Sequence, residues 1–418
     1  MENLNKITTK KKILFVTGDP VIPFNGGVQQ LTQNLSKSLI DKGYEVICLA
    51  LYRKRHSEDI IYTVPQYFFP KTDIRSKENI SFYNDFILQK KIDVIINQEG
   101  YIKLSYLFLN INAEIRKSIK IITVCNNKPL SSYNRNYRYK LFLTTETNVK
   151  TIVKTIIKIL FFPVWRLLQP CRESAFFRNL YIFILNQSDK FVVNSSKYIS
   201  EIQSVIHCDS LEDKFVVIPN PNTYSVSYEM CPAKQKQVLY VGRLEPNQKR
   251  PDLLLKIWKK IHKKHSDWEL IILGSGIMEN KLKSYIKRHQ LERVYFKGTI
   301  DPLPYYRNAS IIALTSIYEG FPMILIEAMV HGVVPVLFDS FGAASDVVIP
   351  DKTGLLVTPF DINEFASKLS GLIQNEELRH KLSENAKDHV KRYDMQIIMK
   401  EWEQLIQNNE LGFNFCLK

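Results

Sequence analysis

The 418-residue sequence predicts an α/β protein with two domains, each built on a mainly parallel β-sheet. Short apolar runs alternate with helical segments along the whole chain, which is the pattern of repeated β-α-β units. Several of these runs are apolar at every position, as in strands covered on both faces. With 45% hydrophobic residues, the chain is long enough to bury two cores of ordinary size.

The amino-acid composition indicates what kind of partner the protein binds and in which cellular compartment it works. The net charge of +15 indicates an anionic partner, which could be a nucleic acid, a membrane surface or a phosphorylated substrate. The six cysteines are scattered without a C-x-x-C pair, so we expect reduced thiols. The polar, basic start lacks a signal-peptide core, and no window holds the roughly 18 apolar residues of a spanning helix. We therefore expect a cytoplasmic protein.

The amino-terminal half opens with a β-α-β unit. A strand over 13–16 is followed by a helix with apolar residues near a 3.6-residue period and by a strand over 44–49. Gly26 and Gly27 precede the helix and would let the backbone approach a ligand closely. The G-x-G-x-x-G motif is absent, so we predict no dinucleotide site. The alternative is a glycine turn that serves only helix packing.

Two further strands of this half end in polar residues. The apolar runs 92–97 and 120–125 lead into Asn97-Gln98-Glu99-Gly100 and Asn126-Asn127-Lys128-Pro129. The first strand of the half similarly leads into Gly18-Asp19. Ligands of open α/β sheets bind outside the carboxyl ends of strands, so these positions are candidate ligand contacts.

Residues 148–178 carry six basic residues and one acidic residue among many apolar ones. Lys150, Lys154 and Lys158 recur every four residues and would share one face of a helix, with Trp165 and Arg166 shortly after. A basic amphipathic helix with aromatic neighbours can lie in the headgroup region of an anionic leaflet. The alternative is a helix packed on the domain with its lysines in solvent. We see no RNA-binding signature, so no nucleic-acid partner is expected.

The carboxyl-terminal half begins with a strand over 237–241 that runs into a turn at Gly242. Arg243 and Lys249, six residues apart across this turn, could converge on one diphosphate, although two solvated surface cations are the alternative. Strands over 269–273 and 294–298 follow, with Thr299 just after the second.

The most informative stretch is a strand, tight turn, helix and strand over 311–338. Glu319 lies in the turn with Gly320 and Phe321, Pro322 suits the first helical position, and Glu327 lies within the helix that Gly332 ends. The helix start would offer unpaired N–H groups and the positive end of the dipole, which together suit a phosphate. Those N–H groups belong to Met323, Ile324 and Leu325. The alternative is a buried strand–helix unit with two solvated glutamates.

Glu319 and Glu327, eight residues apart and followed by Ala328-Met329 and Gly332, resemble the E-x7-E signature of retaining glycosyltransferases of family 4. That resemblance implies the GT-B architecture, in which two Rossmann-like domains with parallel sheets face a central cleft. Pro322 stands where many members have glycine.

The resemblance assigns a role to each candidate residue. Arg243 and Lys249 would bind the diphosphate and, with Glu319, make up the catalytic set. Glu319 would hold the sugar hydroxyls and Glu327 the ribose. The further donor-binding residues would be Gly26, Gly27, Gly242, Thr299, Gly320, Phe321, Met323, Ile324 and Leu325. Asp19, Glu99 and Asn126 would lie on the acceptor and sugar side, with Asn126 where relatives often have a histidine.

Three segments are expected: an acceptor-binding domain over 1–218, a nucleotide-sugar-binding domain over 219–392, and a terminal helix over 393–418 that returns to the first domain. The expected activity is transfer of a hexose, with retention, from a nucleotide-diphosphate sugar such as a UDP-sugar. The acceptor would be a glycan or lipid-linked sugar of cell-surface polysaccharide synthesis, met peripherally at the inner face of the membrane. No D-x-D pair is present, so no metal or other cofactor is expected. The alternatives are a nucleotide-sugar-binding protein that no longer transfers and a sugar-nucleotide epimerase of the same architecture.

Overall fold

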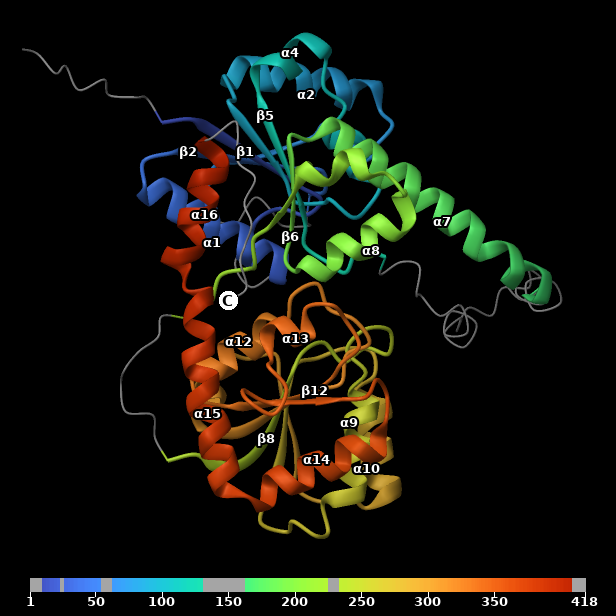
Figure 1. Ribbon diagram of the computed structural model, residues 1–418, viewed down its shortest axis with the longest axis vertical. Helices are drawn as coiled ribbons and strands as arrows, with labels where there is room; N and C mark the ends of the chain where they lie inside the picture. Colours follow the sequence, from blue (N-terminus) through green and yellow to red (C-terminus); the bar gives the residue numbers. More distant parts are fainter. Residues whose placement is uncertain (1–9, 23–25, 54–61, 131–161, 225–232, 408–418) are drawn as a thin grey trace, which may run out of the picture. The chain divides into compact units, whose positions relative to one another are not determined.

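The computed structural model describes residues 10–22, 26–53, 62–130, 162–224 and 233–407. These residues form two compact units, each with its own parallel sheet (Figure 1). The first unit contains the described residues of 1–129, 176–221 and 395–418, and the second contains those of 130–175 and 222–394. The two parallel sheets confirm the α/β fold class that the sequence predicts.

The first unit is built on seven parallel strands in the order β3-β2-β1-β4-β5-β6-β7. The strands are β1 (Lys12–Thr17), β2 (Glu45–Ala50), β3 (Gln66–Phe68), β4 (Val94–Asn97), β5 (Lys120–Cys125), β6 (Lys190–Val193) and β7 (Phe215–Val217). The order reverses direction between β1 and β4, which is the topological switch point where open α/β sheets bind ligands.

The helical segments of this unit connect the strands. They are α1 (Gly27–Asp41), α2 (Lys77–Lys90), α3 (Ser105–Phe108), α4 (Ala113–Ser118), α8 (Ser196–Ile206) and the 3-10 helix η2 (Asp209–Lys214), together with α7 (Phe162–Gln187) from residue 176 onward. Two helix starts carry the side-chain caps that the sequence favours. Ser76 accepts from the N–H of Asn79, and Ser195 accepts from the N–H of Lys197.

The second unit has six parallel strands in the order β10-β9-β8-β11-β12-β13. The strands are β8 (Gln235–Val241), β9 (Glu269–Leu273), β10 (Val294–Gly298), β11 (Ala309–Leu314), β12 (Val334–Phe338) and β13 (Leu355–Val357). Its helices are α9 (Pro251–Ile261), α10 (Glu279–His289), α11 (Leu303–Asn308), α12 (Met323–Val330), α13 (Ala344–Val347), α14 (Ile362–Gln374), α15 (Glu376–Val390) and the 3-10 helix η3 (Lys391–Tyr393). The switch point of this sheet lies between β8 and β11.

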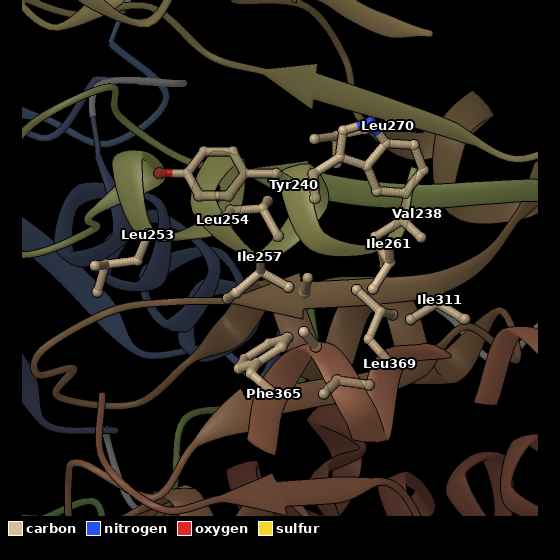
Figure 2. Packing of buried hydrophobic residues seen from close by; sticks show 14 of the residues in the cluster. Val238, Tyr240, Leu253, Leu254, Ile257, Ile261, Leu270, Ile311, Phe365 and Leu369 are labelled. Carbon is tan, nitrogen blue, oxygen red and sulfur yellow. The ribbon is translucent and has the colours of Figure 1, made fainter. Parts of the chain in front are cut away.

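The core of the second unit forms where α9 and α14 cover one face of the sheet. Ile257 and Ile261 of α9 and Phe365 and Leu369 of α14 are buried against Val238 and its strand neighbours (Figure 2). Burial of each such side chain stabilises the fold by about 1.5–3 kcal/mol. This packing holds the carboxyl ends of β8 and β11 in fixed positions, and the candidate site is built there.

The last helix, α16 (Met395–Gln407), belongs to the first unit, where it lies beside α1 (Figure 1). Trp402 and Ile406 of α16 are buried in the same core as Ile13 and Phe15 of β1. Tyr393 precedes the helix and belongs to the second unit, where its hydroxyl donates to the carbonyl of Asp346 at 2.8 Å.

Candidate active site

The candidate site of the second unit lies at the sheet's switch point. The β8 strand runs into the loop that carries Arg243 and Lys249, and β11 runs into the turn that carries Glu319. Because β8 and β11 are paired in parallel, their carboxyl ends meet at one edge of the sheet. The topology alone therefore brings together residues that are about 70 positions apart in the sequence.

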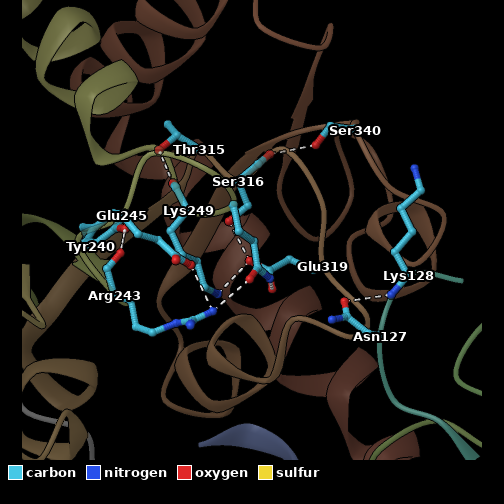
Figure 3. A network of polar contacts seen from close by, with 11 residues as sticks. Asn127, Lys128, Tyr240, Arg243, Glu245, Lys249, Thr315, Ser316, Glu319 and Ser340 are labelled. Atoms are coloured by element: carbon cyan, nitrogen blue, oxygen red, sulfur yellow. Dashed lines mark hydrogen bonds and ion pairs between the residues drawn. The ribbon is translucent and has the colours of Figure 1, made fainter. Parts of the chain in front are cut away.

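Lys249 and Glu319 form a buried ion pair at this edge. The Lys249 ammonium lies 2.7 Å from Oε1 of Glu319, and the two side chains are only 15% and 7% exposed. The same Glu319 oxygen accepts from the hydroxyl of Ser316 at 2.6 Å, and the other oxygen accepts from the amide of Gln248 at 3.0 Å. The carboxylate is thus held by three side chains (Figure 3).

Arg243 joins this network through Gln248. Its guanidinium donates to the amide oxygen of Gln248 at 3.0 Å and pairs with Glu245 at 2.9 Å, while 68% of the side chain stays exposed. Figure 3 shows Arg243 and Lys249 converging on the turn that carries Glu319. The structure therefore brings together the three residues predicted to make up the catalytic set.

Backbone contacts fix the loop against the turn. The N–H of Ile317 donates to the carbonyl of Gln248 at 2.7 Å, and the Thr315 hydroxyl donates to the carbonyl of Arg250 at 2.9 Å. Gly242 has a φ of +155°, and a Cβ on Gly274 would lie 2.0 Å from the Gly242 carbonyl oxygen. The two turns that follow β8 and β9 therefore approach too closely for a side chain at position 274.

The start of α12 differs from the sequence prediction in one respect. Met323 N–H donates to the carbonyl of Phe321 and Leu325 N–H donates to that of Pro322, both at 2.9 Å, so these two predicted free donors are bonded within the turn. Pro322 precedes the helix instead of occupying its first position, with φ −81° and ψ 75°, the geometry of an inverse γ-turn. The proline favours this turn because its ring holds φ near −65°. The prediction of three unpaired amides at Met323, Ile324 and Leu325 is therefore wrong for two of them.

Glu327 is held inside the second unit by two hydroxyls. Its carboxylate accepts from Thr223 at 2.9 Å and from Tyr306 at 3.0 Å. Burial raises the pKa of Glu327, and these two hydrogen bonds act in the opposite direction. The predicted solvated alternative for this glutamate is wrong. Thr223 and Tyr306 were missed by sequence reasoning because nothing in their local sequence links them to position 327.

The remaining donor-side candidates lie in both units. Thr299 is exposed after β10 and shares a 2.9 Å hydrogen bond with the hydroxyl of Ser275. Gly320 and Phe321 are buried in the turn. In the first unit, Gly26 has φ +137° and precedes Gly27, the first residue of α1.

The acceptor-side candidates lie at the switch point of the first unit. Glu99 follows β4, is 8% exposed, and accepts from the N–H of Gly18 at 2.9 Å. Burial raises the pKa of Glu99 to about 7, and the nearby Asp19 carboxylate, which is exposed, adds to the rise. Asn126 follows β5 and donates to Gln98 through its side-chain amide. Asp19, Glu99 and Asn126 are thus placed on adjacent strands of one sheet edge.

The candidate membrane contacts lie largely outside the described residues. Lys150, Lys154 and Lys158 fall in the range 131–161, and only the backbone of α7 is described at Trp165 and Arg166. Among the described residues, no helix combines the length and the apolar character needed to cross a bilayer.

Two protein-family models together match most of the chain. The family model "Glycosyltransferase Family 4" matches residues 25–221, and "Glycosyl transferases group 1" matches residues 230–389. The chain is 31% identical to the amylovoran biosynthesis glycosyltransferase AmsD of Erwinia amylovora, over 56% of this chain and 66% of that protein. It is 27% identical to a Campylobacter jejuni alpha-1,4-N-acetyl-D-galactosaminyltransferase whose name gives a diphospho-undecaprenol-linked glycan, over 58% of this chain and 63% of that protein. The alignments thus span slightly less than two thirds of these relatives.

A solved structure extends the likeness to the whole fold. TarM of S. aureus, in complex with UDP, fondaparinux and alpha-GlcNAc-glycerol, superposes with a TM-score of 0.70 at 16% identity, covering 95% of this chain and 100% of that one. The fold is therefore that of the GT-B class. Together the two family models cover most of the sequence, and the chain belongs to glycosyltransferase family 4.

Proposed function

We propose that the chain transfers a hexose from a UDP-sugar to a glycan or lipid-linked acceptor in cell-surface polysaccharide synthesis, with retention of configuration. The observation that carries the proposal is the Lys249–Glu319 pair with Arg243 beside it at the switch point of the second unit. Two cations and a carboxylate at this edge suit a diphosphate joined to a sugar with hydroxyl groups.

The proposed chemistry depends on charge that builds up as the bond to the sugar breaks. Departure of the nucleoside diphosphate places negative charge on its terminal phosphate. The Lys249 ammonium and the exposed Arg243 guanidinium would stabilise that charge, as preorganised positive groups do in many transfer reactions. Because these two cations supply the charge, we propose that no metal or other cofactor is required.

Two carboxylates would bind hydroxyl groups of the donor. Glu319 is held by Ser316, Gln248 and Lys249, so its orientation is set before any ligand arrives. We propose that it accepts from the hydroxyls of the sugar, and that Glu327 accepts from the ribose. Carboxylates suit this role because both of their oxygens accept hydrogen bonds.

The acceptor class draws support from two comparisons. The Campylobacter relative's name specifies a diphospho-undecaprenol-linked acceptor, and AmsD is named for amylovoran biosynthesis. We propose that this chain meets such an acceptor at the inner face of the cell membrane, where its +15 charge and the basic residues of 148–178 would favour anionic lipid.

The test is transfer by the purified chain. Radiolabelled UDP-glucose, UDP-galactose and their N-acetyl forms are incubated with a panel of glycosides and undecaprenyl-diphosphate-linked sugars. Label in a new product supports the proposal, and NMR coupling constants of the new bond report whether configuration is retained. Binding of a UDP-sugar with no transfer to any acceptor favours the non-transferring alternative, and conversion of the donor sugar to its epimer favours the epimerase.

A further inference from the structure

A cavity of about 200 Å³ lies between α9 and α10, two helices of the second unit that pack against each other (Figure 1). Its walls come from these helices and from the residue just before each of them. Among the described residues, none of those assigned above to the donor or the acceptor lines it. The cavity therefore lies outside the site that carries Lys249 and Glu319, and the proposed transfer makes no use of it.

The floor of the cavity is apolar. Met278 and Leu282, four positions apart at the start of α10, are 5% and 1% exposed. Tyr285 also lines the cavity and is partly buried against the same core. A ligand therefore meets carbon atoms at the bottom of the cavity and can bury part of its own carbon skeleton there.

The rim of the cavity carries charged side chains. Arg250 and Asp252 form a two-pronged ion pair, with N–O distances of 2.8 and 2.9 Å and side chains that are 18% and 19% exposed. Lys256 of α9 and Lys281 of α10 are exposed, and neither has a hydrogen-bond or ion-pair partner within the part of the chain that the structure describes. Three cations and one carboxylate leave the rim with a net charge of +2.

The segment around the cavity is also strongly basic. Residues 250–298, which span α9 to β10, contain twelve Lys and Arg against five Asp and Glu, a net charge of +7. Nearly half of the formal charge of +15 therefore lies in one short part of the chain. Because clustered positive charge raises the local concentration of anions, we expect an anionic ligand here.

A small phosphate ester matches the charge and the size of the cavity. A phosphate monoester carries a charge of about −1.5 to −2 near pH 7, close to the charge that balances the rim. Arginine binds phosphate through its planar fork and lysine binds it as a compact charge. Asp252 repels an anion, so the phosphate belongs nearer the two lysines, while the same carboxylate keeps Arg250 in place. Pockets for drug-sized ligands measure about 300–1,000 Å³, so the volume suits a small ester and not a whole nucleotide sugar.

We propose that the cavity between α9 and α10 is a binding site for a small phosphate ester. Its phosphate group is held by Arg250, Lys256 and Lys281. Its carbon part lies on Met278 and Leu282. This site goes beyond the proposed function, since it uses no residue assigned to the donor or the acceptor. The ester is either a soluble molecule or the headgroup of an anionic lipid, because both present the same phosphate group.

The test uses the full chain and glycerol 3-phosphate, which is a soluble ester and also the headgroup portion of phosphatidic acid. Lys256→Met/Lys281→Met removes the two unpaired cations. Lys259→Met/Lys287→Met, the matched control, removes the same charge from exposed positions of the same two helices that do not line the cavity. Because all four lysines are exposed, both variants should fold as the wild type does. Calorimetry with and without saturating UDP separates this site from the one that binds the donor diphosphate.

The wild type should bind glycerol 3-phosphate with UDP present. The variant at positions 256 and 281 should bind it at least about tenfold more weakly, and the control should stay within about twofold of the wild type. Glycerol, which lacks the phosphate, should not bind. In the lipid arm, phosphatidylcholine vesicles with and without phosphatidic acid are floated with each protein. Flotation with phosphatidic acid that only the cavity variant loses assigns the site to a lipid headgroup, and binding of the soluble ester without flotation assigns it to a soluble ligand.

Three results would overturn the proposal: no binding in either arm, equal losses in the cavity variant and the control, or glycerol binding as tightly as glycerol 3-phosphate. UDP affinity is measured for the same three proteins and should be equal in all of them. A loss of UDP binding in the cavity variant alone would show that the cavity belongs to the donor site and would also overturn the proposal. If none of the proteins binds UDP while the cavity variant alone loses glycerol 3-phosphate, the proposed function fails and the phosphate site stands.

Discussion

The buried pair between Lys249 and Glu319 gives the sharpest quantitative prediction for the free protein. The two side chains are 15% and 7% exposed and their charged atoms lie 2.7 Å apart. Removing one partner of a buried pair costs about 3–5 kcal/mol, because the other charge is left without compensation. Lys249→Met leaves Glu319 with its Ser316 and Gln248 donors, so we expect the lower end, about 3 kcal/mol.

A double-mutant cycle isolates the pair. Lys249→Met, Glu319→Gln and the double variant are unfolded in urea, and the free energies of unfolding are compared. Because the second substitution removes a charge that the first has already left unpaired, we expect the double variant to lose about 2 kcal/mol less than the sum of the singles. Lys236→Met, which breaks an exposed pair with Asp267, is the control and should change little. Additive losses at positions 249 and 319 would refute the reasoning.

Three further predictions concern separate parts of the site. Burial raises the pKa of Glu99 from 4.5 to about 7, so this carboxyl group ionises at lower pH in the unfolded chain than in the folded protein. The free energy of unfolding of the wild type should therefore fall between pH 4.5 and 7 by at most about 3 kcal/mol more than that of Glu99→Gln. Urea titrations that give parallel pH profiles for the two proteins would contradict this. Glu327→Ala should weaken UDP binding in calorimetry by more than about 1 kcal/mol, and equal affinity would argue against a ribose contact. Neutral substitution of the three lysines at 150, 154 and 158 should release the chain from anionic vesicles at lower salt in flotation assays, whereas identical flotation would remove the membrane argument.

The fold can be predicted well from the sequence because most strands are recognisable as short apolar runs. The apolar runs at 13–16, 120–125 and 311–314 each lie within an observed strand, since a strand covered on both faces must be apolar throughout. The three-residue strand β3 cannot be predicted from an apolar run, because its residues are only partly buried. Glycine and proline also lie next to helix ends: Gly43 follows the end of α1 by two residues, Pro322 directly precedes α12, and Gly332 follows the end of α12 by two residues.

The site is predictable only in part, for a physical reason. Arg243, Lys249 and Glu319 were identified through local motifs, and the structure joins them. Gln248 links them, yet a glutamine in a polar loop has no distinguishing sequence feature. Contacts such as Thr223 with Glu327 join residues 104 positions apart, and no local pattern encodes them. The γ-turn at Pro322 likewise depends on the packed turn, because proline is equally compatible with the first helical position.

The central claim is that the edge of the second unit binds a nucleoside diphosphate through the cations at 243 and 249. Calorimetric titration of UDP and of uridine into the wild type and Lys249→Met tests it most directly. The account predicts that the wild type binds UDP at least about tenfold more tightly than uridine, since the charge-assisted bonds to the diphosphate are worth about 1.5–3 kcal/mol each, and that Lys249→Met reduces this preference. Equal affinity of the wild type for UDP and uridine would contradict it.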